Sequence, residues 1–309
     1  MNKPKAASHI QEIALTAAMF LYGTSFIATK IALETYDPIT IITVRNVISG
    51  LLLLGTLLLR EGKKGLPKIK ELKILLLVAV FQPFLYFLSE TYGITMVEAS
   101  LASIIIATIP VFTPLIARFF FDEGLNKFNY LGLLLSAAGV ALIVVSSRTP
   151  EGMPVRPLGI ILLFGAVFAA VGYSIVVKKT SKTLSSLAVT SMQNCMGALL
   201  FLPLFFAVDY SHAVSQEISA LPVLSIVYLA IFPSSLAFLC MNAGIRAIGP
   251  TRAMVFTNMV PVVTAVLSFY ILHETFTLLK VTGMVIILCG VILSQRGSAK
   301  TANEIVIDR

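Results

Sequence analysis

The chain has 309 residues, of which 57% are hydrophobic and 12% are charged, and its mean hydropathy is +0.93. Since an average soluble domain carries about 25% charged residues, this composition excludes a water-soluble fold built around a single core. The net charge of +8 would suggest a nucleic-acid ligand in a soluble protein, but most of the bases lie in one set of loops between apolar segments, which indicates membrane orientation instead.

Ten apolar segments are long enough to cross a bilayer core about 30 Å thick, which needs about 20 helical residues. The sequence therefore predicts an all-α integral membrane protein with ten transmembrane helices. In chain order they cover residues 11–32, 39–59, 72–93, 99–120, 128–146, 157–177, 187–208, 221–244, 250–271 and 277–295. The first segment is long and lacks a small-residue cleavage pattern, so we expect an uncleaved helix rather than a signal peptide.

Basic residues are distributed unevenly between alternate loops. With the amino terminus inside, the cytoplasmic side collects 18 Lys and Arg residues, and the outer side collects Arg148, Arg156 and Lys280. Positive charge is retained on the cytoplasmic side of membrane proteins. Both termini of this multi-pass chain are therefore predicted to be cytoplasmic.

The two halves of the chain repeat each other. An offset of 151 residues pairs Pro110 with Pro261, Glu123 with Glu274, Gly132 with Gly283 and Gly139 with Gly290. Chance agreement between two apolar sequences explains matched Leu and Val better than it explains matched Pro, Glu and Gly. Each unit holds five helices, and because five is odd the second unit enters the membrane from the opposite side. The sequence thus predicts two inverted five-helix repeats, 11–146 and 157–295, which are typical of secondary transporters.

The helix predicted at 72–93 carries a polar stripe. Gln82, Tyr86 and Ser89 recur at spacings of four and three residues along one helix face, with Glu90 beside them. Polar groups are costly in lipid, so these side chains need a partner or a cavity. We predict that the stripe binds substrate, and the alternative is a hydrogen-bonded seam between helices.

Matched prolines interrupt four predicted helices, since Pro83 and Pro233 lie at an offset of 150 and Pro110 and Pro261 at an offset of 151. A proline inside a helix removes a backbone hydrogen bond and bends the axis. Interrupted helices at matched positions indicate a transport site, although the kinks could merely shape helix packing. Further predicted substrate-binding residues lie along the neighbouring helices: Tyr22, Tyr173, Ser235, Asn242 and Asn258.

Three charged residues lie in the outer half of the predicted bilayer: Lys30, Arg45 and Glu90. The functional interpretation is an outer gate in which Glu90 pairs with Lys30 or Arg45, or a proton-coupling role for Glu90. Alternatively, Lys30 and Glu90 extend to the outer headgroups. Arg45 lies about 9 Å into its helix, so we expect it to have a partner. Glu123 and Glu274 are expected to have structural roles at helix ends.

The sequence resembles EamA-type, ten-helix members of the drug/metabolite transporter superfamily from about residue 11 to residue 295. The resemblance is carried by Gly23-Thr24-Ser25-Phe26, Lys30, Arg45, the two copies of the Pro-Glu-Gly-Gly pattern, and Gly249-Pro250-Thr251-Arg252-Ala253. Similar proteins often carry Trp where this chain has Tyr22. The resemblance implies export of small metabolites, often amino acids, across the bacterial inner membrane, and it leaves the substrate open.

The predicted function is that of a secondary active or facilitative transporter, a monomer or homodimer, that exports small amphipathic metabolites by alternating access, with protons as a candidate coupling ion. The sequence has no Walker-type phosphate loop, Ser/His/Asp arrangement or zinc-ligand spacing, so we expect no catalytic residues, metal or cofactor. Sparse charge argues against highly anionic substrates. The alternatives are an integral-membrane enzyme or lipid-handling protein, and an accessory membrane subunit that does not transport.

Overall fold

The structure is a computed structural model that describes residues 5–121, 127–146, 156–180 and 184–307. Within these ranges the chain is almost entirely helical and contains no strand. Eight segments of the described residues are long and apolar enough to cross a membrane, and Lys127–Leu142 and Leu278–Ser294 form two shorter apolar helices. Helices satisfy every backbone polar group within one segment, as lipid requires. The predicted all-α membrane fold is confirmed.

The first half contains α1 (Lys5–Ala32), α2 (Pro38–Glu61), η1 (Gly62–Gly65), α3 (Ile69–Ala79), η2 (Val80–Leu85), α4 (Tyr86–Met96), α5 (Ala99–Ile106), α6 (Ile109–Phe121) and α7 (Lys127–Ser146). The second half contains α8 (Pro157–Thr180), α9 (Ser186–Leu204), η3 (Phe205–Asp209), α10 (Tyr210–Ser215), α11 (Ala220–Ile231), η4 (Phe232–Ala237), α12 (Phe238–Ile248), α13 (Pro250–Val255), η5 (Phe256–Met259), α14 (Val260–Ile271) and α15 (Leu278–Ile307). Several predicted single helices are thus divided by short irregular turns.

These divisions coincide with the matched prolines. Pro83 and Pro233 each lie in a π-helical segment, η2 and η4 respectively. Pro110 and Pro261 each lie at the second position of a helix, α6 and α14, that follows a break in the preceding helix. Because proline has no backbone N–H, it cannot continue the hydrogen-bond ladder of the helix before it. Each half therefore has two interruptions at equivalent places.

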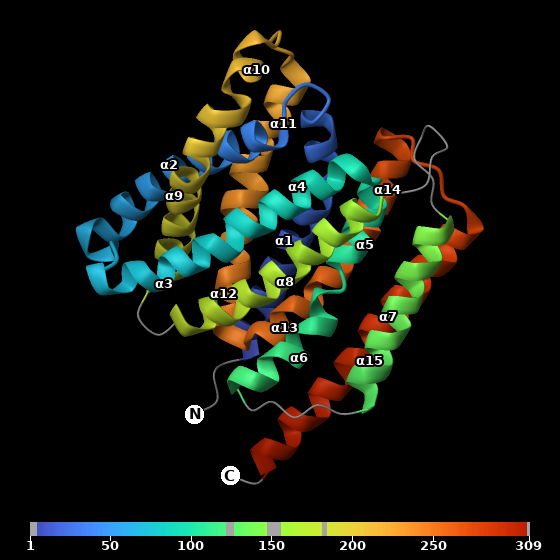
Figure 1. The fold of residues 1–309 in the computed structure, drawn as a ribbon. Helices are drawn as coiled ribbons and strands as arrows, with labels where there is room; N and C mark the ends of the chain where they lie inside the picture. Colours follow the sequence, from blue (N-terminus) through green and yellow to red (C-terminus); the bar gives the residue numbers. More distant parts are fainter. Residues whose placement is uncertain (1–4, 122–126, 147–155, 181–183, 308–309) are drawn as a thin grey trace.

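The packing of α7 against α15 shows how the two halves are related. These helices lie side by side, α7 in green and α15 in red (Figure 1). A β-carbon placed on Gly132 would collide with the carbonyl oxygen of Gly290, and one on Gly139 would lie 2.8 Å from that of Gly283. Since Gly132 corresponds to Gly283 and Gly139 to Gly290, exchanging the two halves converts one contact into the other. Such reciprocal contacts are produced by an internal two-fold axis, as in inverted repeats.

The chain begins α1 and ends α15 at the same end of the bundle (Figure 1), as expected for an even number of crossings. The α4–α5 and α14–α15 connections lie at the opposite end, which we call the distal end. The distribution of basic residues between alternate loops predicts that the distal end faces the outside of the cell.

Candidate substrate cavity

A cavity of about 60 Å³ is enclosed by residues from both halves. Since one water needs at least about 10–15 Å³ of such volume, the cavity has room for a few water molecules. It is lined by Tyr22, Ser25 and Phe26 of α1, Arg45 of α2, Gln82 of η2, Tyr86, Phe87 and Glu90 of α4, Ile106 of α5, Ile109 of α6, Ala170 and Tyr173 of α8, Phe238 and Met241 of α12, Met254 of α13, Thr257 of η5 and Val260 of α14.

Four predicted substrate-binding residues line this cavity: Tyr22, Gln82, Tyr86 and Tyr173. The interruption in η2 contributes directly, because Gln82 has extended backbone angles (φ −151°, ψ 116°) inside an otherwise helical segment. Its amide side chain lines the cavity although the residue is buried. The hydroxyl of Tyr22 is buried without a hydrogen-bond partner in the described structure, so it is available to a bound solute.

Arg45 and Glu90 also line the cavity, and both side chains are buried. The Nε of Arg45 donates to Ser234 Oγ at 3.0 Å, and its Cζ lies 3.9 Å from the centre of the Phe87 ring. Glu90 Oε1 accepts a hydrogen bond from Tyr86 Oη at 2.9 Å. Glu90 therefore faces inward, and the alternative that it extends to the headgroups does not hold. The cavity thus contains one guanidinium and one carboxyl group between aromatic rings.

The predicted pairing of Glu90 with Lys30 is wrong. The ion pairs among the described residues join other groups, and neither Arg45 nor Glu90 takes part in one. The charge of Lys30 interacts instead with Glu274 and Glu98, because Lys30 lies in the last turn of α1, at the distal end of the bundle. The charges of Arg45 and Glu90 interact with each other across the cavity wall, but no direct ion pair joins them in the described structure.

Two predicted site residues have other surroundings. Ser89 faces α8, where a β-carbon on Gly165 would lie 3.3 Å from Ser89 Oγ. Tyr86 and Glu90 are one full turn apart, so the cavity-facing side of α4 continues to Glu90 and leaves Ser89 in a helix–helix seam. Ser235 Oγ donates to the carbonyl oxygen of Ala230, in the last turn of α11, at 2.8 Å.

Asn242 and Asn258 also stand outside the cavity lining. Asn242 Oδ1 accepts from Tyr173 Oη at 2.5 Å, and its Nδ2 donates to Thr190 Oγ1 at 2.8 Å. It therefore supports a cavity residue from behind. Asn258 follows Thr257, which does line the cavity, and its Oδ1 is buried without a hydrogen-bond partner in the described residues. Glu123 lies outside the described residues.

Some residues of this region were missed by sequence reasoning. Gln193 Oε1 lies 2.9 Å from Tyr173 Oη, and Asn194 accepts from Ser49 Oγ at 2.8 Å. Two adjacent amides inside an apolar helix are a signal that could have identified both, because buried polar groups in lipid need partners. Phe87 and Phe238 carry no such signal, since a cavity-lining Phe and a lipid-facing Phe look alike in an apolar sequence.

The chain resembles known transporters over nearly its full length. The model of the EamA-like transporter family matches it twice, at residues 9–145 and 157–295. The uncharacterized transporter YetK of Bacillus subtilis is 27% identical over 91% of this chain and 86% of its own length. The uncharacterized inner membrane transporter YedA of Escherichia coli K12 is 26% identical over 92% of this chain and 90% of its own.

Two further similarities extend the comparison. The chloroplastic WAT1-related protein At3g02690 of Arabidopsis thaliana is 25% identical over 90% of this chain and 68% of its own length. A solved crystal structure superposes with a TM-score of 0.68 over 93% of this chain and 96% of its own, at 16% identity. At that identity the superposition supports the fold alone.

Proposed function

Because this chain belongs to the EamA-like transporter family, within the drug/metabolite transporter superfamily, we propose that it moves a small zwitterionic metabolite, such as an amino acid, across the membrane by alternating access. The observation that carries the proposal is the pair formed by Arg45 and Glu90. Both are buried, both line one cavity, and they form no ion pair with each other in the described structure.

The cavity has a complementary group for each end of a zwitterion. A guanidinium binds a carboxylate through paired N–H donors, and Arg45 has its Nε held by Ser234 while its other nitrogens have no hydrogen-bond partner in the described residues. An ammonium group would be attracted to Glu90 and to the surrounding aromatic faces. Arg45 and Glu90 interact through their charges without forming an ion pair, so a ligand with one charge of each sign can pair with both, and it is favoured over a polyanion.

The inverted repeats suggest how the cavity changes access. Two similar halves related by an axis in the membrane plane can rock against each other around a fixed midplane site. We propose that units 11–146 and 157–295 move in this way, bending at Pro83 and Pro233 and at the breaks before Pro110 and Pro261. The basic loops support cytoplasmic termini in the bacterial inner membrane, and Glu90 is the proposed proton-coupling residue if transport responds to pH.

The names of the relatives favour transport over the enzyme and accessory-subunit alternatives. Export is the proposed net direction, because the family resemblance implies it.

The first experiment is counterflow in liposomes that contain the purified protein. A labelled panel of neutral amino acids is compared with analogues that lack either the amino or the carboxyl group, with and without a pH gradient. We expect saturable exchange of a zwitterion and weak exchange of both analogues. Arg45→Gln and Glu90→Gln should each abolish exchange at unchanged folded yield. Ser89→Ala, which lies in the seam between α4 and α8 rather than in the cavity lining, is the matched control. Exchange that survives both cavity substitutions would refute the proposed site.

A further inference from the structure

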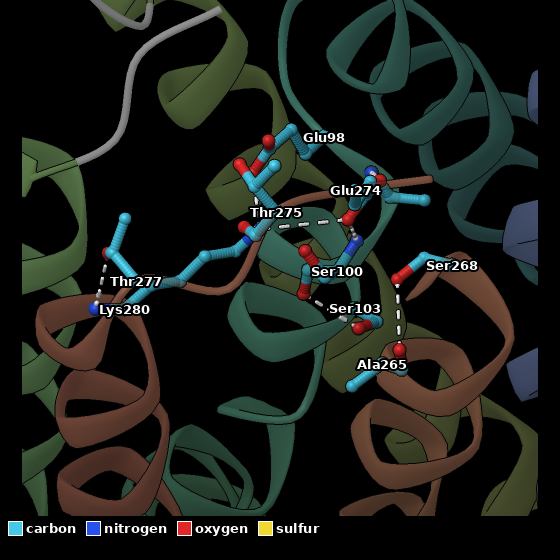
Figure 2. Close-up of polar contacts among 10 residues, drawn as sticks. Glu98, Ser100, Ser103, Ala265, Ser268, Glu274, Thr275, Thr277 and Lys280 are labelled. Carbon is cyan, nitrogen blue, oxygen red and sulfur yellow. Dashed lines mark hydrogen bonds and ion pairs between the residues drawn. The ribbon is translucent and has the colours of Figure 1, made fainter. Parts of the chain in front are cut away.

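A second cluster of charges lies at the distal end of the bundle, apart from the cavity. Glu98 lies between α4 and α5, Glu274 lies in the α14–α15 connection, and Lys280 lies in the first turn of α15. Figure 2 shows Lys280 reaching from α15 toward Glu98 and Glu274. Lys280 Nζ lies 2.5 Å from Glu98 Oε2 and 3.7 Å from Glu274 Oε2. We call these three residues the distal cluster.

The distal cluster is withdrawn from water. The side chains of Lys280, Glu274 and Glu98 are 4%, 8% and 16% exposed. Lys30, in the last turn of α1, adds a second positive charge that interacts with both carboxylates. Two cations and two anions thus balance in a buried environment, where each charge depends on its partners because the desolvation cost of an unpaired charge is high.

Glu274 connects the two halves through the backbone. Its Oε1 accepts from the N–H of Ala99 at 2.7 Å and its Oε2 from that of Ser100 at 3.3 Å. These are the first amides of α5, whose positive helix end favours an anion. The chain turns Glu274 toward α5 just after His273, which adopts a left-handed conformation with φ 54°. A residue of the second half therefore caps a helix of the first, which extends the predicted helix-end role.

The cluster lies over the helices that close the cavity on this side. Lys30 in α1 and Ala99 in α5 lie nearer the distal end, and Phe26 and Ile106 lie deeper in the same two helices. Phe26 and Ile106 are the residues that line the cavity. In α5 this separation is seven residues, or about 10 Å. The helices α1 and α14 are also in direct contact, since Thr264 Oγ1 donates to the carbonyl oxygen of Gly23 at 3.0 Å.

We propose that Glu98, Glu274 and Lys280 form the distal gate of the transport cavity, and that opening toward this end separates Lys280 and Glu274 from α5. The inference rests on the proposed alternating access. Lys280 is the central residue because it alone among the three is a cation and it reaches both carboxylates. Its removal leaves two buried carboxylates close together, and separating the helices relieves that cost by admitting water.

The test measures access to the cavity without any substrate. The cysteines Cys195, Cys240 and Cys289 are replaced by Ala, and Ser25→Cys places a reporter thiol in the cavity wall. A membrane-impermeant thiosulfonate reagent is added from either side of proteoliposomes, at about pH 8, where carboxylates are ionised. Lys280→Met should raise the labelling rate from the distal side by roughly tenfold and lower it from the other side. Lys280→Arg should label like the parent.

The controls separate a gate from general loosening. Lys73→Met removes an exposed lysine of α3 and should leave both rates unchanged. Glu274→Gln keeps the shape of the side chain and removes the negative charge that caps α5, so it tests the gate if Lys280→Met folds poorly, and it should also raise distal labelling. Three results would overturn the gate. The labelling rate could rise equally from both sides, or it could change by less than roughly twofold in both folded variants. The third result is a labelling rate in Lys280→Arg that equals the rate in Lys280→Met. Loss of counterflow with the expected labelling would refute only the proposed substrate.

Discussion

Arg45 is held by two neighbours that cannot neutralise it. Ser234 accepts its Nε hydrogen bond and the Phe87 ring lies over its guanidinium. Both contacts position the charge, and neither supplies a negative charge. At the scale of single residues, this arrangement distinguishes the cavity from the distal cluster, where Lys280 is paired directly with carboxylates. The cavity charges form no direct ion pair and are the proposed contacts for a solute, whereas the charges of the distal cluster join helices directly.

Tyr173 and Tyr22 offer a matched comparison of two cavity hydroxyls. Tyr173 Oη contacts Gln193 and Asn242, whereas Tyr22 Oη has no hydrogen-bond partner in the described residues. Tyr173→Phe should lower the free energy of unfolding by about 1–3 kcal/mol, because two buried amides lose a partner. Tyr22→Phe should leave stability unchanged. Thermal unfolding in detergent measures both, and equal effects would contradict the hydrogen-bond assignment.

The distal cluster should respond to pH through Glu98. Burial raises the pKa of the Glu98 carboxyl, the nearby Glu274 raises it further, and Lys280 and Lys30 oppose both effects. Opening toward water would return this pKa to its ordinary value, so the closed form binds protons more tightly. Acid therefore favours the closed form, and distal labelling of Ser25→Cys should fall as the pH is lowered toward the raised pKa of Glu98.

Two controls isolate that pH effect. Labelling of an exposed cysteine corrects for the pH dependence of the reagent itself. Glu98→Gln should remove the remaining pH dependence. Distal labelling that instead rises with acid would contradict a raised Glu98 pKa in the closed form.

At the scale of elements, the interrupted helices combine local sequence with function. Proline ends the hydrogen-bond ladder, and the π-helical turns of η2 and η4 redirect the side chains that follow. Gln82 enters the cavity because of such a turn. The same break is the proposed point of bending, so one sequence feature would supply both a cavity residue and the proposed motion.

Pro233→Ala tests the second of these roles. Alanine restores a backbone donor and allows η4 to relax toward a regular helix, which should raise thermal stability and lower the turnover rate by roughly tenfold with little change in KM. Pro222→Ala is the control, because Pro222 lies in the first turn of α11, where no N–H donor is needed. Unchanged turnover in Pro233→Ala would show that the kink only shapes packing.

At the scale of the whole molecule, α7 and α15 form the contact in which the inverted symmetry is most direct. Equivalent glycines of the two halves pack against each other, and Ser136 Oγ reaches the carbonyl oxygen of its own equivalent, Ile287, at 3.5 Å. Small residues allow such close approach of helix backbones in a membrane. This contact joins the two halves through helices that do not line the cavity, so the proposed motion need not disrupt it.

Gly290→Ala should therefore destabilise the protein. The added β-carbon would lie 2.5 Å from Ser136 Oγ and 2.8 Å from the carbonyl oxygen of Gly132, and such overpacking costs about 1–3 kcal/mol. Gly55→Ala is the matched control, since a β-carbon there meets nothing within 4 Å, and it should stabilise the helix by about 0.5–1 kcal/mol. Thermal unfolding of the two variants checks the opposite signs.

The sequence by itself determined the membrane fold and its internal repeat. Long apolar segments have one stable solution in lipid, which is the helix, and matched Pro and Gly residues mark equivalent places because their backbone properties are distinctive. It also identified six polar residues that line the cavity, since polar groups stand out in apolar helices. They are Tyr22, Arg45, Gln82, Tyr86, Glu90 and Tyr173.

Only the tertiary structure decided which polar groups meet. Lys30 joins Glu98 and Glu274 rather than Glu90, and Ser89 enters a seam while Glu90 enters the cavity. The physical reason is that neighbours across helices depend on rotation, tilt and the direction taken after each break. Side-chain spacing along one helix does not specify these quantities. The distal cluster joins residues 98, 274 and 280, which no local pattern could bring together.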